Sequence, residues 1–511
     1  LAAGAGRRLA RCEGGRPAVG PVPTRRGRRV QDGRACGGRG ARRRVLAPVL
    51  RHLAVATDLR ARTAARADRR HPHSGPRAAM TTTPPIRAGQ GLAYGLLGLP
   101  LAFVALPLYV LLPNHYAREF GMPLATLGSV LLAARLFDAV SDPLLGRLSD
   151  YLFGRSVRAV LAVGAVSAVV LALGLTSLFF PQVRGADALI AWALVALLIT
   201  YTAYSQLGIA HQSWGARLGG DELQRGRIVA WREGAALVGV VTASVLPSLL
   251  GLPVMLSVFA FTLLLGWWAW TRAPRPTGHT GAVAGVYRPP QRASLWRPWG
   301  RPAFRRLLAV FMLNGIASAI PATLVLFFIQ DRLQAPPAQE PMFLAAYFVC
   351  AALSIPLWLR AVARRGLART WLAGMLLAIG VFVWTTFLGA GDVVPFLIVC
   401  ALSGVALGTD LALPSALLAG VIAAEGDSGQ HEGAYFGWWN FATKLNLALA
   451  AGLALPLLGW WGYTPGTRSD DGLHTLGLAY AVLPCALKLA AAAALYALLL
   501  RHPRGAALAG T

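Results

Sequence analysis

Long apolar stretches, each followed by a short polar or basic turn, repeat along the chain from about residue 91 onward. A stretch of about 20 apolar residues is long enough to cross a bilayer as a helix. The pattern predicts about twelve such helices, at 91–113, 124–149, 158–180, 187–213, 228–250, 253–271, 304–329, 341–360, 369–389, 393–424, 434–459 and 474–500. The turn between the fifth and sixth, Leu250–Pro253, is the shortest.

Arginines gather in alternate turns, after the second, fourth, sixth and eighth segments, and again after the twelfth. Basic turns stay on the cytoplasmic side, so both termini are predicted to be cytoplasmic, which requires an even number of spans. The acidic turn around Asp427 is the exception, but acids weigh little in orientation. A loop rich in Pro, Arg and Gly at 273–303 separates two sets of six spans. This is the layout of major facilitator carriers, here expected as a multi-pass protein of a bacterial inner membrane.

The composition agrees with this class. The chain is 56% hydrophobic and only 14% charged, with a mean hydropathy of +0.53, whereas soluble proteins are about 25% charged. No segment has the composition of a soluble domain with its own core. The five cysteines show no CxxC or Cys/His spacing, so neither a disulfide nor a metal cage is predicted.

The net charge of +28 is concentrated at the start of the chain. Residues 1–79 hold 20 Arg and four acids, a net +16, without apolar periodicity, and we expect a disordered arm. We interpret it as upstream sequence before a start at Met80; an arm for anionic lipid or nucleic acid is the alternative. No aromatic residues for base stacking accompany these arginines, so no nucleic-acid partner is predicted. The predicted parts are then 80–272 and 304–501, the two six-helix halves, joined by 273–303 and followed by a tail at 502–511.

Three charged residues interrupt the second apolar segment: Arg135, Asp138 and Asp142. Their spacing puts them on one face of a helix. Ionised groups at membrane depth are costly unless they pair, face water or bind an ion. Two carboxylates one turn apart also repel each other, which Na⁺ or H⁺ between them would relieve. The cluster predicts a cation site; a structural network with Arg135 is the alternative. Arg135 itself is predicted to pair with the acids and hold their geometry, with direct contact to a substrate as the alternative.

The run from Arg135 to Gly146, Arg-Leu-Phe-Asp-Ala-Val-Ser-Asp-Pro-Leu-Leu-Gly, resembles the helix II signature of the glycoside–pentoside–hexuronide:cation symporters, the melibiose-carrier-like branch of the major facilitator superfamily. Thr200-Tyr201-Thr202 in the fourth segment and a lone lysine, Lys444, in the eleventh are similar to that carrier too. The resemblance implies a cation site of Asp138, Asp142 and Thr202, with Lys444 nearby. Sugar-binding members have acids in helices I and IV, where this chain has Pro100 and Ser205, so the resemblance supports the cation site more than a particular sugar.

Further polar residues interrupt other apolar segments. Lys444 is predicted to be a counter-charge to the two aspartates, or else a lysine that extends to the membrane interface. Asp410 is predicted to be a substrate anchor or proton carrier, or else a salt-bridge partner of Lys444. Arg135, Lys444 and Asp410 form the predicted charge network. Residues predicted to line a substrate cavity are Tyr94, Ser205, Gln206, Asn314, Trp439 and Asn440.

These features together predict a secondary carrier, not an enzyme, that couples Na⁺ or H⁺ to the symport of a small polar solute such as a sugar or glycoside. It is expected to need no cofactor beyond the coupling ion, to lie in the lipid bilayer and to act as a monomer. No GxxxxGK[ST] loop occurs, so nucleotide is not expected. One alternative is a proton-driven exporter or amphiphile carrier with the same acids. Another is a polytopic assembly factor or membrane enzyme, although charged residues spread at mid-depth over several helices favour a transport path.

Overall fold

The computed structural model describes residues 86–276, 294–463, 466 and 469–501. The chain divides into two compact units, Leu1–Met80 and Thr81–Thr511, and all described residues belong to the second. The predicted arm at 1–79, most of the central loop and the predicted tail at 502–511 lie outside the described residues. The domain boundaries proposed there stay predictions.

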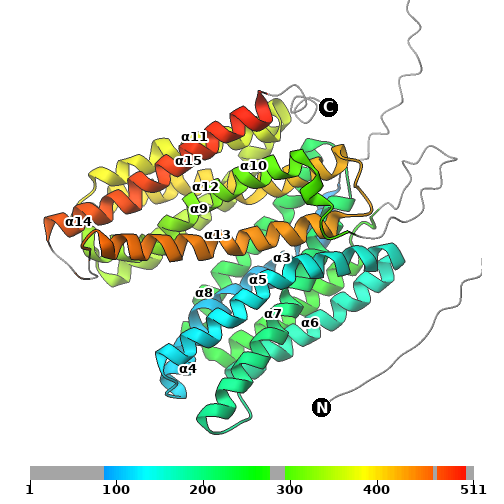
Figure 1. The fold of residues 1–511 in the computed structure, drawn as a ribbon, viewed down its shortest axis with the longest axis horizontal. Coiled ribbons are helices and arrows are strands. Elements are labelled where there is room, and N and C mark those ends of the chain that lie inside the picture. Colours follow the sequence, from blue (N-terminus) through cyan, green and yellow to red (C-terminus); the bar gives the residue numbers. More distant parts are fainter. Residues whose placement is uncertain (1–85, 277–293, 464–465, 467–468, 502–511) are drawn as a thin grey trace, which may run out of the picture. The chain divides into compact units, whose positions relative to one another are not determined.

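All regular structure in the described residues is helical (Figure 1). The elements before residue 277 are α2 (Ala88–Gly95), α3 (Gly98–Phe103), a π-helical turn (Pro107–Leu111), α4 (Leu112–Glu119), α5 (Leu124–Arg155), α6 (Val157–Phe179), α7 (Ala186–Arg217) and α8 (Glu222–Thr271). Those after residue 293 are a 3₁₀ turn (Pro298–Gly300), α9 (Pro302–Phe327), a π-helical turn (Phe328–Arg332), a 3₁₀ turn (Pro337–Gln339), α10 (Glu340–Arg365), α11 (Leu367–Phe382), a 3₁₀ turn (Val383–Phe387), α12 (Val393–Ala424), α13 (Glu432–Trp460), α14 (Asp470–Gly477), a π-helical turn (Leu478–Val482), α15 (Leu483–Leu495) and a π-helical turn (Tyr496–Leu500).

Ten helices of the described part are long and apolar enough to cross a membrane. Two further long helices, α5 with 32 residues and α13 with 29, are not among the ten. They carry the charged residues that the sequence singled out, Asp138 and Asp142 on α5 and Lys444 on α13. An all-helical, multi-pass membrane protein is therefore confirmed, while the count of twelve spans stays a prediction.

The short turn predicted at Leu250–Pro253 is present inside α8. Gly251 has φ 79° and ψ 172°, a left-handed and non-helical conformation that glycine adopts without a Cβ clash. Pro253 lies two residues later and cannot donate the backbone hydrogen bond of a continuing helix. The helix is thus divided into two candidate spans, Glu222–Pro247 and Leu249–Thr271.

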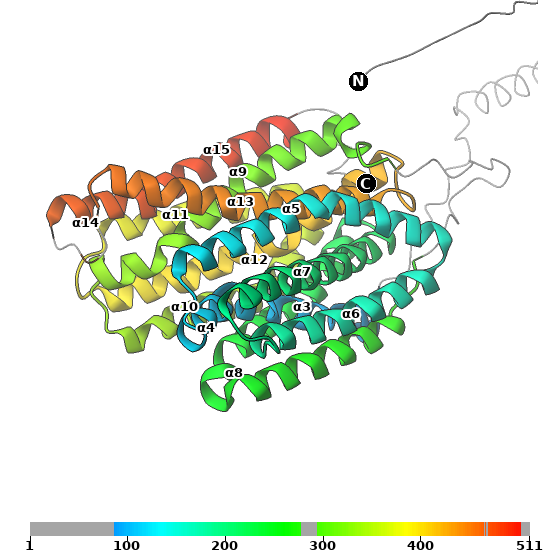
Figure 2. The ribbon, with the colours of Figure 1, turned by 60° about the horizontal axis from the view of Figure 1, so that its bottom comes forward.

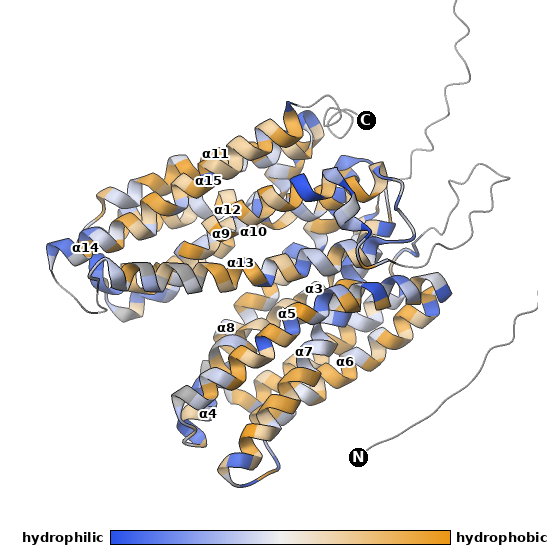
Figure 3. Cartoon of the chain, in the orientation of Figure 1, coloured by the Kyte–Doolittle hydropathy of each residue, from blue (hydrophilic) through white to orange (hydrophobic). Residues whose placement is uncertain are grey.

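Hydrophobic residues occur along all the long helices, as the orange colour in Figure 3 shows, and many of their side chains are exposed. Leu132, Leu173 and Phe261 are 65–69% exposed in the isolated protein. Large apolar groups in such numbers need a nonaqueous surrounding, because exposed apolar area of this extent is rare on soluble monomers. This surface is suited to lipid.

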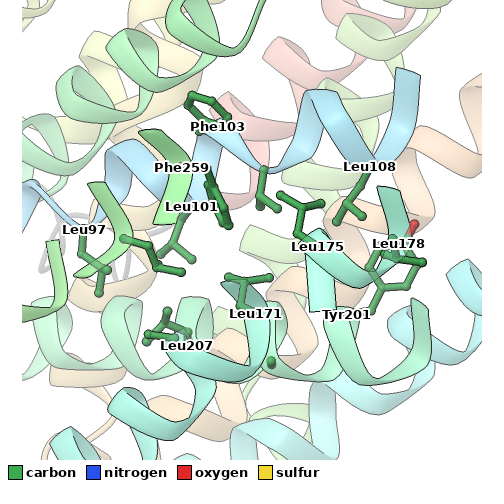
Figure 4. Close-up of a cluster of buried hydrophobic side chains, with 14 of the residues drawn as sticks. Leu97, Leu101, Phe103, Leu108, Leu171, Leu175, Leu178, Tyr201, Leu207 and Phe259 are labelled. Atoms are coloured by element: carbon green, nitrogen blue, oxygen red, sulfur yellow. The ribbon is translucent and has the colours of Figure 1, made fainter. Parts of the chain in front are cut away.

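A buried apolar cluster holds the first spans together (Figure 4). Leu101 of α3, Leu171 of α6, Leu207 of α7 and Phe259 of α8 all belong to it. Tyr201 of α7 lies in the same cluster, fully buried. Side chains of α3, α6 and α8 therefore pack against α7, the helix that carries Ser205.

Helices α5 and α13 lie side by side, as both ribbon views show (Figures 1 and 2). Glycines allow the two backbones to touch. A Cβ on Gly433 would lie 2.1 Å from the carbonyl oxygen of Gly146, and a Cβ on Gly437 would lie 2.6 Å from that of Asp142. Lys444 follows Gly437 by two helical turns on α13, so this contact brings its side chain to the aspartates of α5.

Candidate functional site

Lys444 lies between the two aspartates of α5. Its Nζ is 2.7 Å from Asp138 Oδ1 and 2.8 Å from Asp142 Oδ1. The same ammonium donates to Ser205 Oγ of α7 at 2.8 Å, and Ser205 Oγ donates to Asp138 Oδ1 at 2.8 Å. Three helices thus meet at one charged cluster, which we call the central charge site: Asp138, Asp142, Ser205 and Lys444.

Burial makes this site sensitive to charge. Asp138 is 2% exposed and Asp142 is fully buried, whereas the Lys444 side chain remains 21% exposed. Buried carboxylates are strongly destabilising without a counter-charge, and the ammonium supplies it. The ammonium also stands where a small cation would find carboxylate and hydroxyl oxygens. A site of this kind can exchange its internal cation for a bound one.

Arg135 does not join the central charge site, so the predicted pairing of this residue with the acids is wrong. In the described part of the chain it makes no ion pair, and its guanidinium Cζ lies 4.5 Å from the centre of the Tyr109 ring. The physical reason is that both acids already have a counter-charge, because Lys444 contacts Asp138 Oδ1 and Asp142 Oδ1.

Thr202, which the resemblance assigns to the cation site, makes no hydrogen bond to either aspartate. Its hydroxyl donates to the carbonyl oxygen of Leu198 in its own helix at 2.7 Å. Ser205, predicted to face the substrate cavity, supplies the hydroxyl that contacts the charged groups instead. The two positions are three residues apart on one side of α7, and it is the hydroxyl of Ser205 that contacts the charged groups of α5 and α13.

Asp410 belongs to a second cluster, and its predicted alternative pairing with Lys444 is wrong. Lys488 Nζ of α15 lies 2.8 Å from Asp410 Oδ2 and 2.8 Å from Ser318 Oγ of α9. Trp371 Nε1 of α11 donates to Asp410 Oδ1 at 2.8 Å. Asp410 lies on α12, so four helices of the part after residue 293 share this buried ion pair.

The predicted cavity residues have different surroundings. Tyr94 is 1% exposed and its hydroxyl donates to the carbonyl oxygen of His211. Trp439 is 3% exposed and stacks on Phe311 with ring centres 3.9 Å apart. Both side chains are largely buried, and Tyr94 lines a small pocket together with Arg232. The place of Tyr94 and Trp439 at a substrate cavity stays a prediction. Asn440 is partly buried.

Gln206 and Asn314 are buried amides with unsatisfied atoms. Gln206 is 4% exposed and neither its oxygen nor its nitrogen has a hydrogen-bond partner. Asn314 is 3% exposed and its Oδ1 has none. A buried amide without partners is costly unless water or a ligand satisfies it, so these two positions keep their predicted place among polar groups available to a solute.

Sequence reasoning missed a network at the C-terminal end of α5. Asp150 accepts hydrogen bonds from the backbone N–H groups of Gly433 and Ala434 at 2.6 and 2.8 Å, and so caps the first turn of α13. Arg217 of α7 lies 2.9 Å from Asp150 and 2.9 Å from Glu432. The signal was present as the single acid in the basic turn after the second segment. On α8, Arg232 and Glu233 form an ion pair with each other.

The acidic turn between α12 and α13 also forms hydrogen bonds and ion pairs. Asp427 accepts hydrogen bonds from Arg297, Arg301 and the hydroxyl of Tyr435, the last at 2.8 Å. Burial alone would raise the pKa of Asp427, but these three donors outweigh it and hold the pKa below its ordinary value. The turn thus neutralises basic residues that precede α9.

Comparison with known proteins identifies the family. The profile of the MFS/sugar transport protein family matches residues 91–501. The chain belongs to this family. The major facilitator resemblance of the α5 motif is thereby confirmed, and the protein is a transporter and not an enzyme. A relative from Salmonella typhimurium, named as a candidate sulfoquinovose importer, is 25% identical over 425 residues, or 78% of this chain and 87% of the relative.

Solved structures share the fold. A bacterial homologue of the iron transporter ferroportin, in an outward-facing state, matches 80% of this chain and 100% of its own with a TM-score of 0.59 at 15% identity. The E. coli fucose:proton symporter matches 80% of this chain and 97% of its own with a TM-score of 0.54 at 16% identity. The human organic anion transporter matches 80% and 100% with a TM-score of 0.55 at 19% identity. Likeness at this identity establishes the major facilitator fold alone.

Proposed function

We propose that this family member is a cation-coupled symporter that imports a small sugar-like solute by alternating access. The observation that carries the proposal is the position of Lys444 Nζ, 2.7 to 2.8 Å from carboxylate oxygens of both Asp138 and Asp142. A cation that binds the two carboxylates competes with this ammonium. Cation binding therefore breaks contacts of α5 with α13, the helices that join the parts before and after the central loop.

The coupling follows from charge. With Lys444 in place, one of the two carboxylate charges is offset and the helices are held together. Na⁺ or H⁺ at the carboxylates releases the ammonium toward the solute and offsets that charge in its place. The change in helix contacts and the arrival of the cation are then one event, which is the requirement for coupled transport.

We further propose twelve spans with both termini cytoplasmic, in a bacterial inner membrane. Helices α5 and α13 have 32 and 29 residues, long enough to cross a bilayer beside the ten apolar spans. This topology puts the Asp150 cap on α13 at the cytoplasmic side. The contacts at this end then represent a carrier closed toward the cytoplasm.

Thermal unfolding of the purified full-length protein tests the cation site. We expect Na⁺, Li⁺ or lowered pH to raise the melting temperature, and Asp138→Asn and Asp142→Asn to abolish that response. Asp187→Asn, an exposed acid at the start of α7, is the matched control and should leave the response intact. If none of these cations changes the melting temperature, or if the control and site variants behave alike, cation coupling at this site is excluded.

Uptake into proteoliposomes tests the solute. The relative from Salmonella suggests sulfoquinovose as the first compound to assay, beside neutral sugars. A cation gradient directed inward should drive accumulation. Accumulation only when the gradient is reversed would instead support the proton-driven exporter.

A further inference from the structure

We propose that the turn between α10 and α11 binds the headgroup of an anionic phospholipid, whose acyl chains lie along the exposed face of α10. Four arginines at this turn form the binding surface, which we call the arginine patch: Arg360, Arg364, Arg365 and Arg369. The inference concerns a lipid partner of the carrier and does not depend on its solute or on its coupling ion.

The arginine patch has no compensating charge. Its four guanidiniums lie within ten residues, and the sequence from Pro341 to Gly391 contains no Asp or Glu. All four arginines are exposed, and within the described residues none of their side chains forms an ion pair or a hydrogen bond. Four uncompensated positive charges at one place attract an anion.

A tight turn keeps these arginines together. The helix α10 ends at Arg365 and α11 begins at Leu367, so Gly366 alone connects them. Its φ of 77° is left-handed, which glycine adopts without a Cβ clash. Glu222 of α8 also reaches this turn, where its carboxylate accepts a hydrogen bond from the Leu367 N–H at 2.7 Å without an ion pair to the patch. The four guanidiniums therefore remain available to an external anion.

An apolar face of α10 leads into the arginine patch. Leu353 and Leu357 are 75% and 55% exposed and lie one helical turn apart. Arg360 and Arg364 continue the same face at spacings of three and four residues. The exposed surface thus changes along one line from apolar to positively charged. This order matches the acyl chains and the headgroup of an anionic lipid, whereas a soluble anion would use only the charged part.

The arginine patch begins at the depth of lipid headgroups. Between Glu340 and Arg360, α10 carries no charged residue. The rise over this stretch is about 30 Å, which is the thickness of the hydrocarbon core of a bilayer. With Glu340 at one membrane surface, Arg360 lies at the other surface, at the level of the lipid phosphates.

The chemistry of the guanidinium group favours a phosphodiester with a net negative charge. Forked N–H donors pair with two phosphate oxygens at once. Each basic residue that meets an anionic headgroup strengthens binding about fivefold. A zwitterionic lipid has the same phosphate but carries its own ammonium beside it, which repels the arginines. The patch should therefore prefer phosphatidylglycerol to phosphatidylcholine.

Lipid binding to the delipidated full-length protein in neutral detergent tests the proposal. Dioleoylphosphatidylglycerol and dioleoylphosphatidylcholine share acyl chains and phosphate and differ in net charge. Glycerophosphoglycerol supplies the anionic headgroup without acyl chains. Titrations followed by native mass spectrometry give a dissociation constant for each probe. We expect phosphatidylglycerol to bind at least about tenfold more tightly than either of the other two.

A triple variant assigns this preference to the arginine patch. Arg360→Gln/Arg364→Gln/Arg369→Gln should weaken phosphatidylglycerol binding about 100-fold, from about fivefold for each charge, and should leave phosphatidylcholine binding unchanged. The three side chains are exposed and unpaired, so their loss should not disturb the fold, and melting curves verify this. The double variant Arg364→Gln/Arg369→Gln, with an expected loss of about 25-fold, is the second test if the triple variant does not fold.

The matched control removes the same charge elsewhere. Arg147→Gln/Arg155→Gln/Arg158→Gln changes three exposed arginines at the turn between α5 and α6 and should keep the preference for phosphatidylglycerol. An equal loss in both triple variants would show only general attraction between a basic protein and an anionic lipid, and would overturn the site.

Two further results would overturn the proposal. Phosphatidylcholine that binds as tightly as phosphatidylglycerol, or a preference unchanged in the patch variants, would show that the four arginines do not select the headgroup. Glycerophosphoglycerol that binds as tightly as the intact lipid would make the patch a site for a soluble phosphate ester and not for a lipid.

Discussion

Lys444 Nζ donates to Asp142 Oδ1 at 2.8 Å across 302 residues of sequence, and this contact ties α13 to α5. In the sequence, Asp142 precedes the central loop and Lys444 follows it. If a proton or a cation binds the Asp142 carboxylate, this pairing weakens, and the packing of both parts of the carrier changes. The central charge site thus connects the two parts of the chain, and we propose that it also binds the coupling ion.

Loss of the ammonium should destabilise the protein strongly. Lys444→Gln leaves two buried carboxylates without their counter-charge, a change that costs about 3–5 kcal/mol in buried ion pairs. We expect the melting temperature to fall, and Na⁺ or acid to raise it again, because either one neutralises a carboxylate. The double variant Lys444→Gln/Asp142→Asn should recover much of the stability without Na⁺. Equal melting temperatures for Lys444→Gln and the native chain would show that the contact contributes nothing.

The two hydroxyl residues of α7 should differ in effect. Ser205→Ala removes hydrogen bonds to Asp138 and Lys444 and should cost about 1–3 kcal/mol. Thr202→Ala removes only a bond to the carbonyl of Leu198, so it should cost less and retain the response to cations. Melting curves with and without Na⁺ measure both. A Na⁺ response lost in Thr202→Ala but kept in Ser205→Ala would support the threonine that the resemblance implies.

The second cluster should stabilise the part after residue 293 without affecting cation binding. Asp410→Asn and Lys488→Met each leave one charge buried alone, so each should lower the melting temperature by more than the double variant does. The response to Na⁺ or pH should persist in all three. A double-mutant cycle measures the coupling between the two side chains. Altered cation dependence of transport in Asp410→Asn would instead make this pair part of the coupling path.

Asp427 should stabilise the protein in a pH-dependent way. Its pKa is held below its ordinary value, so its contribution is complete above the unfolded pKa of about 4 and is lost as pH falls through the folded value. Asp427→Asn should therefore lower the melting temperature at pH 7 and reduce the difference between native and variant chains toward pH 3. Glu119→Gln, an exposed acid, is the control. A difference that grows on acidification would contradict the assignment.

The sequence predicted the long helices because apolar length and helical period are local properties, while the count of twelve spans stays a prediction. The turn at Gly251 and the shared environment of Asp138 and Asp142 also follow from local sequence. Which lysine meets which acid does not. Lys444 and Lys488 lie in different spans, and only helix packing decides that the first pairs with α5 and the second with Asp410. Arg135 shows the same limit, because the ring of Tyr109 comes from another span.

The contact between α5 and α13 should depend on the small size of Gly437. A Cβ there would lie 2.6 Å from the carbonyl oxygen of Asp142, so Gly437→Ala must separate the helices. Since Lys444 lies two turns further, its distances to the aspartates should lengthen as well. We expect a lower melting temperature and a smaller rise in that temperature when Na⁺ is added. The control is Gly452→Ala on the same helix, where nothing lies within 4 Å of the added Cβ. Alanine favours a helix over glycine by about 0.5–1 kcal/mol, so this control should melt at the native temperature or above it. Equal destabilisation of both variants would show that the close approach of the helices is not what Gly437 provides.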